Sequence, residues 1–271
     1  MARIVRRRLQ LSRGAAESRV SARPRLVCPE ILDELSPTDA RAVRARRDLQ
    51  RVNRVMGSCG IVSRAVRRVL ASAPTSAPAS ALRHGRLRIL ELGAGDGSLT
   101  LRIAKHLATS WPAAELTLLD RQGLIAEATG SAFAHLGWTL HPLTVDILEW
   151  ARAPTQQQLA THWDVILANL FLHHFEEGGL RELLSAVADR CNAFVACEPR
   201  RSLPALTGSR LLFALGVSAD TRHDAVVSVR AGFRDNELSR MWPAGGTRWR
   251  MEEHPAGLFS HLFVAARGAT A

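Results

Sequence analysis

The sequence lacks several features that would each place it in a particular class of protein. Its four cysteines, Cys28, Cys59, Cys191 and Cys197, include no C-x-x-C pair, which argues against a disulfide framework or a zinc site and favours a reducing compartment. No apolar run reaches the length of a membrane span, and no apolar signal-peptide core follows the arginine-rich N-terminus, which fits either a transit peptide or a disordered tail. We therefore expect a cytoplasmic protein without a membrane span.

Lysine is also nearly absent, since Lys105 is the single lysine beside 35 arginines. The net charge is +11, but residues 1–88 hold 20 arginines against six acidic residues, a balance of +14. The remaining residues hold 15 arginines and one lysine against 19 acidic residues, a balance of −3. A basic footprint for RNA would include the catalytic face. The distribution favours a preference for arginine codons and predicts no nucleic-acid partner.

The chain divides into three parts: a basic, disordered tail over 1–35, a helical extension with an Ala/Ser/Pro linker over 36–85, and a larger domain over 86–271. Ser36-Pro37-Thr38-Asp39 is typical of a helix start, with Ser36 as the cap, and Gly57 predicts its end. A second helix follows. These helices either cap a pocket, with Asn53 as a candidate contact, or pack on the edge of a sheet.

A glycine-rich turn is the most informative feature of the larger domain. The apolar run Ile89–Leu92 leads into Gly93, Gly95 and Gly97, and a helix is predicted from Ser98 to about Thr109. Glu91 adds a fixed negative charge, which would repel a pyrophosphate and suits a nucleoside with a charged amino-acid tail. The turn also nearly fits the nicotinamide fingerprint G-x-G-x-x-G/A, so the turn alone leaves both ligands open.

Polar residues end four predicted strands. Residues 115–120, 138–145 and 163–170 are the apolar runs that follow Ile89–Leu92, and helical stretches such as 124–135 and 180–190 separate them. In a doubly wound α/β sheet the carboxyl ends of the strands share one crevice. We therefore expect the side chains at these ends to converge: Glu91, Asp120, Asp146 and Asn169.

This order of turn and strand ends resembles class I S-adenosylmethionine-dependent methyltransferases over roughly residues 86–267. The resemblance implies a Rossmann-like, seven-stranded, doubly wound sheet, S-adenosyl-L-methionine as cofactor, and a terminal antiparallel hairpin, here residues 247–254 and 257–266 joined by Pro255-Ala256. It implies that Glu91, Gly93 and Gly95 hold the methionyl part, Asp120 the ribose hydroxyls, and Asp146 and Ile147 the adenine. The remaining predicted cofactor residues are Ala94, Arg121, Asn169 and His174.

The segment after the fourth strand bears on the methyl acceptor. Asn169–Phe175 has no N/D-P-P-Y/F motif of base-amine methylation and instead contains Leu-His-His-Phe, which resembles the ubiquinone and menaquinone small-molecule methyltransferases. A histidine titrates near neutrality and could take a phenol's proton. If the segment is extended, adjacent side chains point to opposite sides. We predict His173 as the base and a cofactor-side role for His174; alternatively, both only pack or cap the next helix.

An insertion over residues 199–233 is longer than a plain connection. Its apolar helix, 203–215, predicts a lid and hence an apolar acceptor. Arg200-Arg201-Ser202 together with Arg222-His223-Asp224 resembles bacterial methyltransferases that tailor phenolic polyketides. That resemblance makes His223 a second catalytic candidate, unless Asp224 pairs with Arg222 and leaves His223 structural.

These patterns together predict a methyltransferase that acts on an oxygen of a small, phenolic or polyketide-like acceptor. An RNA methyltransferase and a non-catalytic cofactor-binding partner subunit are the alternatives. No metal is expected, because acids and histidines are not clustered at ligand spacing in the sequence. The pattern does not define the acceptor or the oligomeric state.

Overall fold

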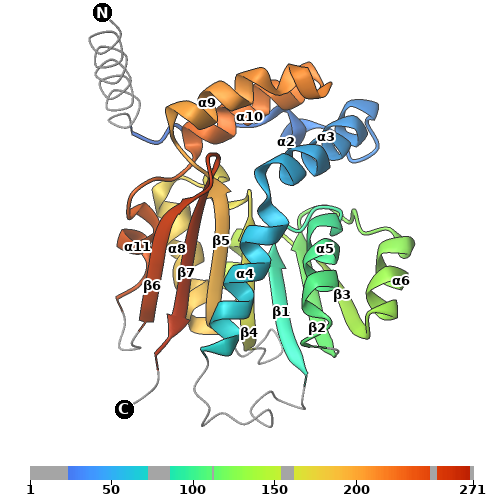
Figure 1. Cartoon of the computed structure of the whole chain (residues 1–271), viewed down its shortest axis with the longest axis vertical. Helices are drawn as coiled ribbons and strands as arrows, with labels where there is room; N and C mark the ends of the chain where they lie inside the picture. The colour runs from blue at the N-terminus through green and yellow to red at the C-terminus, as the bar shows by residue number, and fades with distance from the viewer. Residues whose placement is uncertain (1–23, 73–85, 112, 154–161, 245–248, 269–271) are drawn as a thin grey trace, which may run out of the picture.

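A seven-stranded sheet in the order β3-β2-β1-β4-β5-β7-β6 forms the centre of the computed structural model, which describes residues 24–72, 86–111, 113–153, 162–244 and 249–268 (Figure 1). The strands are β1 Leu87–Leu92, β2 Ala114–Asp120, β3 Trp138–Thr144, β4 Trp163–Asn169, β5 Cys191–Pro199, β6 Trp249–Ala256 and β7 Ser260–Arg267. The first five are parallel, and β7 runs antiparallel between β5 and β6. The predicted α/β fold with its terminal hairpin is confirmed.

The two faces of the sheet are covered by different helices. Helices α4 Ser58–Ala71, α5 Ser98–Leu107 and α6 Glu127–His135 pack on one face, and α7 Ile147–Arg152, α8 Glu177–Arg190 and α11 Glu237–Met241 on the other (Figure 1). Strand β1 supplies both cores, because its side chains alternate: Ile89 packs with α4 and α5, and Leu90 with α8. Among the described helices, none is both long and apolar enough to cross a membrane.

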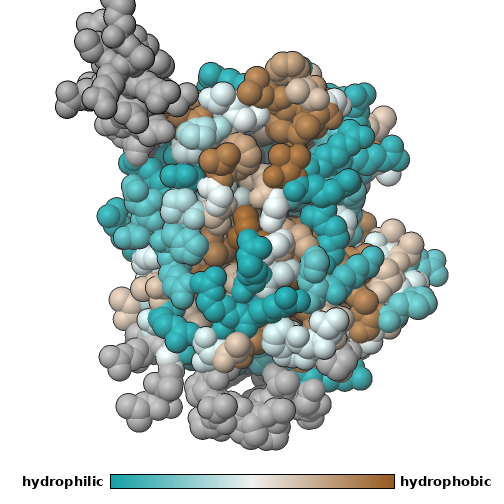
Figure 2. Space-filling view, viewed as in Figure 1, coloured by the Kyte–Doolittle hydropathy of each residue, from teal (hydrophilic) through white to brown (hydrophobic). Residues whose placement is uncertain are grey.

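A helical cap lies over the carboxyl ends of the central strands. It consists of α2 Ile31–Glu34, α3 Ala40–Met56, α9 Leu203–Arg210, the 3-10 helix η4 Leu211–Leu215 and α10 Ala219–Ala231 (Figure 1). Val52 of α3 packs on Leu212 and Val217, so the N-terminal extension and the insertion join in one body. Figure 2 shows apolar side chains gathered on the outside of this cap, where Leu211 and Phe213 are exposed.

Helix α3 belongs to the cap, one of the two predicted placements, whereas α4 packs on a face of the sheet and not at its edge. The cap residue of α3 is Asp39, whose carboxylate accepts the N–H of Arg41 at 2.7 Å, rather than Ser36. Gly57 ends α3 in the left-handed conformation at φ 68°, as predicted.

Residues 24–35 pack against the rest of the molecule, although the sequence predicted a disordered tail that extends to residue 35. The N–H of Leu26 donates to the carbonyl of Arg230 at 3.2 Å, and Glu30 is buried. The tail over residues 1–23 and the linker over residues 73–85 lie outside the described residues. The hairpin turn also differs from the prediction: Ala256 still pairs with Ser260, so residues 257–259 form the turn.

Candidate active site

A crevice of about 740 Å³ lies between the carboxyl ends of the strands and the cap. This volume falls within the range of cofactor and small-molecule sites, roughly 300–1,000 Å³. Its wall joins the glycine turn and the ends of β2 and β4 to the N-terminal segment 27–34 and the inner side of α3. Every predicted cofactor residue lines this crevice: Glu91, Gly93, Ala94, Gly95, Asp120, Arg121, Asp146, Ile147, Asn169 and His174.

The glycine turn is held in one conformation by its surroundings. Gly93 has a φ of 67°, and a Cβ built on it would lie 2.1 Å from the ring of Phe171, so only glycine fits. Gly95 donates its N–H to Oδ2 of Asp120 at 2.8 Å, and Gln122 donates its N–H to Oδ1 at 2.9 Å. Each carboxylate oxygen keeps a further lone pair, which suits the hydroxyls of a ribose.

Glu91 does not carry the fixed negative charge expected from the sequence. It is 4% exposed and accepts a hydrogen bond from the hydroxyl of Thr100. Burial, with the nearby charges of Asp120 and Asp96, raises the pKa of Glu91 to about 8 despite that bond. The side chain is therefore mostly neutral at pH 7 until a cation approaches it.

The ends of β3 and β4 contribute different groups. Asp146 caps α7, and its Oδ1 accepts the N–H groups of Leu148 and Glu149 at 2.8 and 3.2 Å. Asn169 donates from Nδ2 to Oδ1 of Asn53 at 3.3 Å, which brings the predicted pocket contact Asn53 to the crevice. Oδ1 of Asn169 is buried without a hydrogen-bond partner. It is a vacant acceptor on the wall of the site.

The segment after β4 turns sharply into the crevice. Leu170 has a φ of 51°, a left-handed conformation that costs a non-glycine residue about 1–2 kcal/mol. The following residues form the 3-10 helix η3, Leu172–His174. Glu198, fully buried at the end of β5, accepts the N–H groups of Phe171, Leu172 and His173 at 3.1, 3.0 and 3.4 Å. These donors compensate a buried carboxylate and fix the turn.

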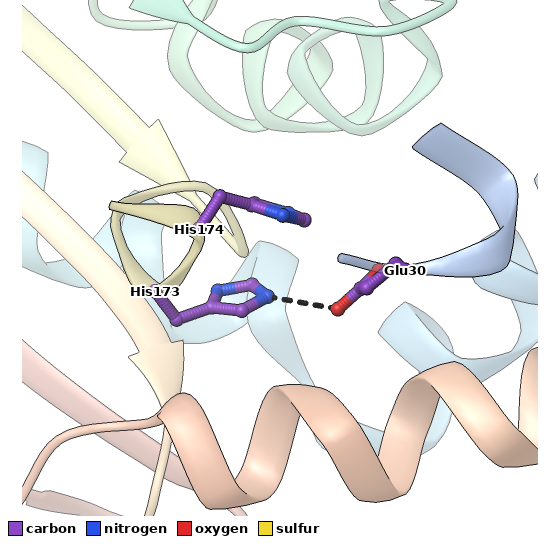
Figure 3. Close-up of side chains that lie close together, drawn as sticks. All are labelled: Glu30, His173 and His174. Atoms are coloured by element: carbon purple, nitrogen blue, oxygen red, sulfur yellow. Dashed lines mark hydrogen bonds and ion pairs between the residues drawn. The ribbon is translucent and has the colours of Figure 1, made fainter. Parts of the chain in front are cut away.

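Glu198 also orients the predicted base. Nδ1 of His173 lies 2.8 Å from Oε2 of Glu198, and Nε2 lies 3.3 Å from Oε1 of Glu30 (Figure 3). Burial opposes a charge on the ring, but the hydrogen bonds and charges of Glu198 and Glu30 outweigh it and raise the pKa of His173 to about 9. A ring held between two carboxylates keeps its proton. The structure therefore does not present His173 as a free base.

His174 lies beside His173, with ring centroids 4.3 Å apart, and both residues line the crevice. The prediction of opposite sides applied to an extended segment, whereas a 3-10 helix places consecutive residues about a third of a turn apart. Nδ1 of His174 lies 3.2 Å from Oδ2 of Asp33. The guanidinium of Arg121 donates to the same Asp33, at 3.0 Å from Oδ1.

The N-terminal segment is fastened over the site from two sides. Arg25 donates to the carbonyls of His173 and Phe175 at 3.3 and 3.2 Å. The carboxylate of Asp224 accepts the N–H groups of Ile31 and Leu32 at 2.9 and 3.1 Å and so caps α2. Sequence reasoning missed Glu30 and the role of Glu198. The strand-end pattern contained a signal for Glu198, which ends the buried run of β5; no pattern pointed to Glu30.

Two predictions from the insertion are not supported. His223 does not line the crevice; its side chain is 57% exposed and lies 3.1 Å from Asp224. Asp224 thus pairs with His223 rather than with Arg222. Residues 203–217, which include α9 and η4, do not line the crevice either. The apolar insertion therefore says nothing about the acceptor.

The fold brings together acid and histidine side chains that are far apart in the sequence. Glu30, His173 and His174 each offer a ligand atom, and these atoms lie within 4.8 Å of one another. Local spacing could not reveal the cluster, because 143 residues separate Glu30 from His173.

No family model and no curated protein matches the chain. Solved structures do. An O-methyltransferase family protein from Burkholderia thailandensis superposes with a TM-score of 0.53 at 13% identity, over 98% of this chain and 71% of that one. The plantazolicin methyltransferase BpumL, in complex with a pentazolic desmethylPZN analog and SAH, gives 0.52 at 15% identity, over 82% and 90%.

A third similar structure, the pyocyanin biosynthetic protein PhzM, is 19% identical with a TM-score of 0.46, over 70% of this chain. The chain spans 53% of the length of that protein. The fold of this chain is that of the class I S-adenosylmethionine-dependent methyltransferases, as its glycine turn and strand ends predicted.

Proposed function

We propose that the chain is an S-adenosylmethionine-dependent methyltransferase that acts on an oxygen of a small, phenolic or polyketide-like acceptor. The observation that carries the proposal is the crevice itself. One part of its wall is the glycine turn with Asp120, and another part is His173 and His174, with Glu198 buried behind His173, so a cofactor and an acceptor fit side by side.

The residues present fit the cofactor. Gly95 leaves the backbone of the turn open, since no atom of the described residues lies within 4 Å of a Cβ built on it, while Gly93 lets the ring of Phe171 pack on the turn. Asp120 offers carboxylate lone pairs for the ribose, and Oδ1 of Asn169 is a vacant acceptor. Asp96 and Asp120 favour a cationic ligand over a pyrophosphate, and Glu91 adds a negative charge once a bound cation makes it release its proton. When bound, S-adenosylmethionine supplies a methyl group on a positively charged sulfur.

The acceptor side joins apolar and polar groups. The rings of Phe171 and Phe175 line the crevice beside the two histidines, and Val27 and Leu32 face it from the N-terminal segment. Such a wall suits an aromatic ring with a hydroxyl group. Holding the acceptor oxygen in line with the methyl group supplies most of the catalysis, on the order of 7–11 kcal/mol in favourable cases.

His173 has a defined place in this scheme. Glu198 fixes its ring so that Nε2 points into the crevice, toward Glu30. To accept a proton from an acceptor hydroxyl, His173 must first lose the proton that it shares with Glu30. In the state described here it would instead donate a hydrogen bond to an acceptor oxygen and stabilise negative charge on it.

The test is transfer of a labelled methyl group from S-adenosylmethionine to a panel of phenols and phenolic polyketides. We expect at least one phenol to be labelled, at a rate that 200 mM salt barely changes. His173→Gln should lower that rate about 10²–10⁴-fold, while His135→Gln, an exposed helical control, should not. If RNA alone is labelled, with a strong salt dependence, the acceptor is RNA and not a phenol. Cofactor binding without transfer to any acceptor would indicate a partner subunit.

A further inference from the structure

Three side chains from two distant segments meet at the acceptor side of the crevice. Glu30 comes from the N-terminal segment, and His173 and His174 come from η3 (Figure 3). Nε2 of His173 and Oε1 of Glu30 lie 3.3 Å apart. That equals the separation of two ligands around a tetrahedral zinc ion, about 3.3–3.4 Å for bonds of roughly 2.0–2.1 Å. The ligand atoms of Glu30, His173 and His174 lie within 4.8 Å of one another, so a movement of the His174 ring toward the other two would complete three ligands.

Hydrogen bonds orient two of the three side chains, as they orient the ligands of known metal sites. Nδ1 of His173 donates to Glu198, which leaves Nε2 directed at the cluster, and Glu198 is itself fixed by three backbone N–H groups. A carboxylate behind a ligating histidine sets the tautomer and raises the basicity of the ring. The hydroxyl of Ser228 donates to Glu30 in the same way. Glu30 and His173 are 9% and 2% exposed, so their positions are defined by packing.

Charge also favours a cation at this point. Glu30 and Glu198 flank His173, and Asp33 adds a third carboxylate beside His174. The guanidinium of Arg121 donates to Asp33, and that of Arg25 donates to main-chain carbonyls. A divalent ion among the three ligands would offset the negative charge of these carboxylates.

We propose that Glu30, His173 and His174 form a binding site for a divalent transition metal ion of the zinc type. Two imidazoles and one carboxylate make up a ligand set found in catalytic zinc sites, which keep a fourth position open. All three residues line the crevice, so the open position faces the space for the acceptor. The ion would also fasten the N-terminal segment to η3.

The use of the fourth position rests on the proposed function. A hydroxyl oxygen of the acceptor binds the ion, which lowers the pKa of the hydroxyl, and its proton leaves to solvent. An electron pair of that oxygen then forms the new bond to the methyl carbon. The pair of the broken carbon–sulfur bond stays on sulfur, which becomes neutral. The ion thus replaces the free base that the structure does not provide.

The test uses the full, tag-free chain, freed of metal with a chelator and titrated with zinc chloride in a calorimeter. We expect one ion per chain. Glu30→Gln and His174→Ala should each bind zinc at least about 100-fold more weakly than the natural chain. The circular dichroism spectrum of each variant shows whether it has folded. His106→Ala, which changes an exposed histidine of α5, should bind zinc as the natural chain does.

A second measurement protects the test against a ligand variant that fails to fold. Zinc should raise the melting temperature of the natural chain, as any ligand specific to the folded state does. An unchanged melting temperature together with no heat of binding would overturn the proposal. Binding that survives in both ligand variants would overturn it too. Neither experiment contains cofactor or acceptor, so its outcome is independent of whether the chain transfers methyl groups.

Discussion

The two walls of the crevice are assembled in different ways. The cofactor wall consists of strand ends and the turn between β1 and α5, all within residues 91–169. The acceptor wall brings together Glu30, His173 and Ser228, from the N-terminal segment, η3 and α10. The first wall follows from the topology of a doubly wound sheet, because parallel strands end at one edge. The second depends on side-chain contacts between segments far apart in the chain.

This difference predicts where each wall is vulnerable. A substitution in the glycine turn should abolish cofactor binding and leave the cap in place. A substitution among Glu30, His173 and Glu198 should disturb the acceptor side and the N-terminal segment, and leave cofactor affinity nearly unchanged.

Gly93→Ala should have the largest effect on the cofactor wall. Its Cβ would overlap the ring of Phe171, and its φ of 67° adds about 1–2 kcal/mol of strain. Calorimetry should detect no S-adenosylmethionine binding. Gly57→Ala is the matched control, since its φ is 68° and nothing lies within 4 Å of a Cβ there. If both variants bind alike, the turn does not form the site.

Glu198→Ala should be the most damaging change on the acceptor wall. It leaves three backbone N–H groups and Nδ1 of His173 without their acceptor, which costs about 3–5 kcal/mol of stability. Methyl transfer should fall about 10²–10⁴-fold. Glu198→Gln keeps a carbonyl oxygen and should recover most of the stability, as denaturant unfolding would show. Equal unfolding of the two variants would contradict the structural role given to Glu198.

Asp120→Ala should weaken S-adenosylmethionine about 10–100-fold, since hydrogen bonds to a charged group contribute about 1.5–3 kcal/mol. It removes the acceptor of the Gly95 and Gln122 N–H groups as well as the expected ribose contact. Asp146→Ala, which removes only the cap of α7 and the adenine-side contact, is the comparison. Calorimetric titration measures both variants, and a larger loss for Asp146→Ala would reverse the assignment.

The smallest expected effect is the pH dependence of S-adenosylmethionine binding. Burial raises the pKa of Glu91 to about 8, so a bound cation should make this residue release its proton at pH 7. Affinity for S-adenosylmethionine should therefore rise with pH from about 6 to 8, by at most tenfold per pH unit, and level off above pH 8. Titrations at pH 7 in buffers of different ionisation enthalpy count the released protons. Glu91→Gln should release none, and proton release that persists in it would exclude Glu91 as the source.

The sequence was sufficient for the fold and the cofactor wall because both depend on local patterns. Apolar runs that end in polar residues defined four of the five parallel strands, and Gly93 and Gly57 marked a turn and a helix end. The acceptor wall escaped prediction for physical reasons. Leu170 adopts a left-handed conformation that begins a 3-10 turn instead of an extended segment, and Glu30 reaches His173 only after the cap has packed.

The measurement that tests the account most directly is calorimetric titration of the purified natural chain with S-adenosylmethionine and, separately, with NADH. The account predicts micromolar binding of S-adenosylmethionine, one per chain, and no heat from NADH. Binding of NADH without S-adenosylmethionine would contradict it, because the acidic groups around the glycine turn would then have failed to exclude a pyrophosphate.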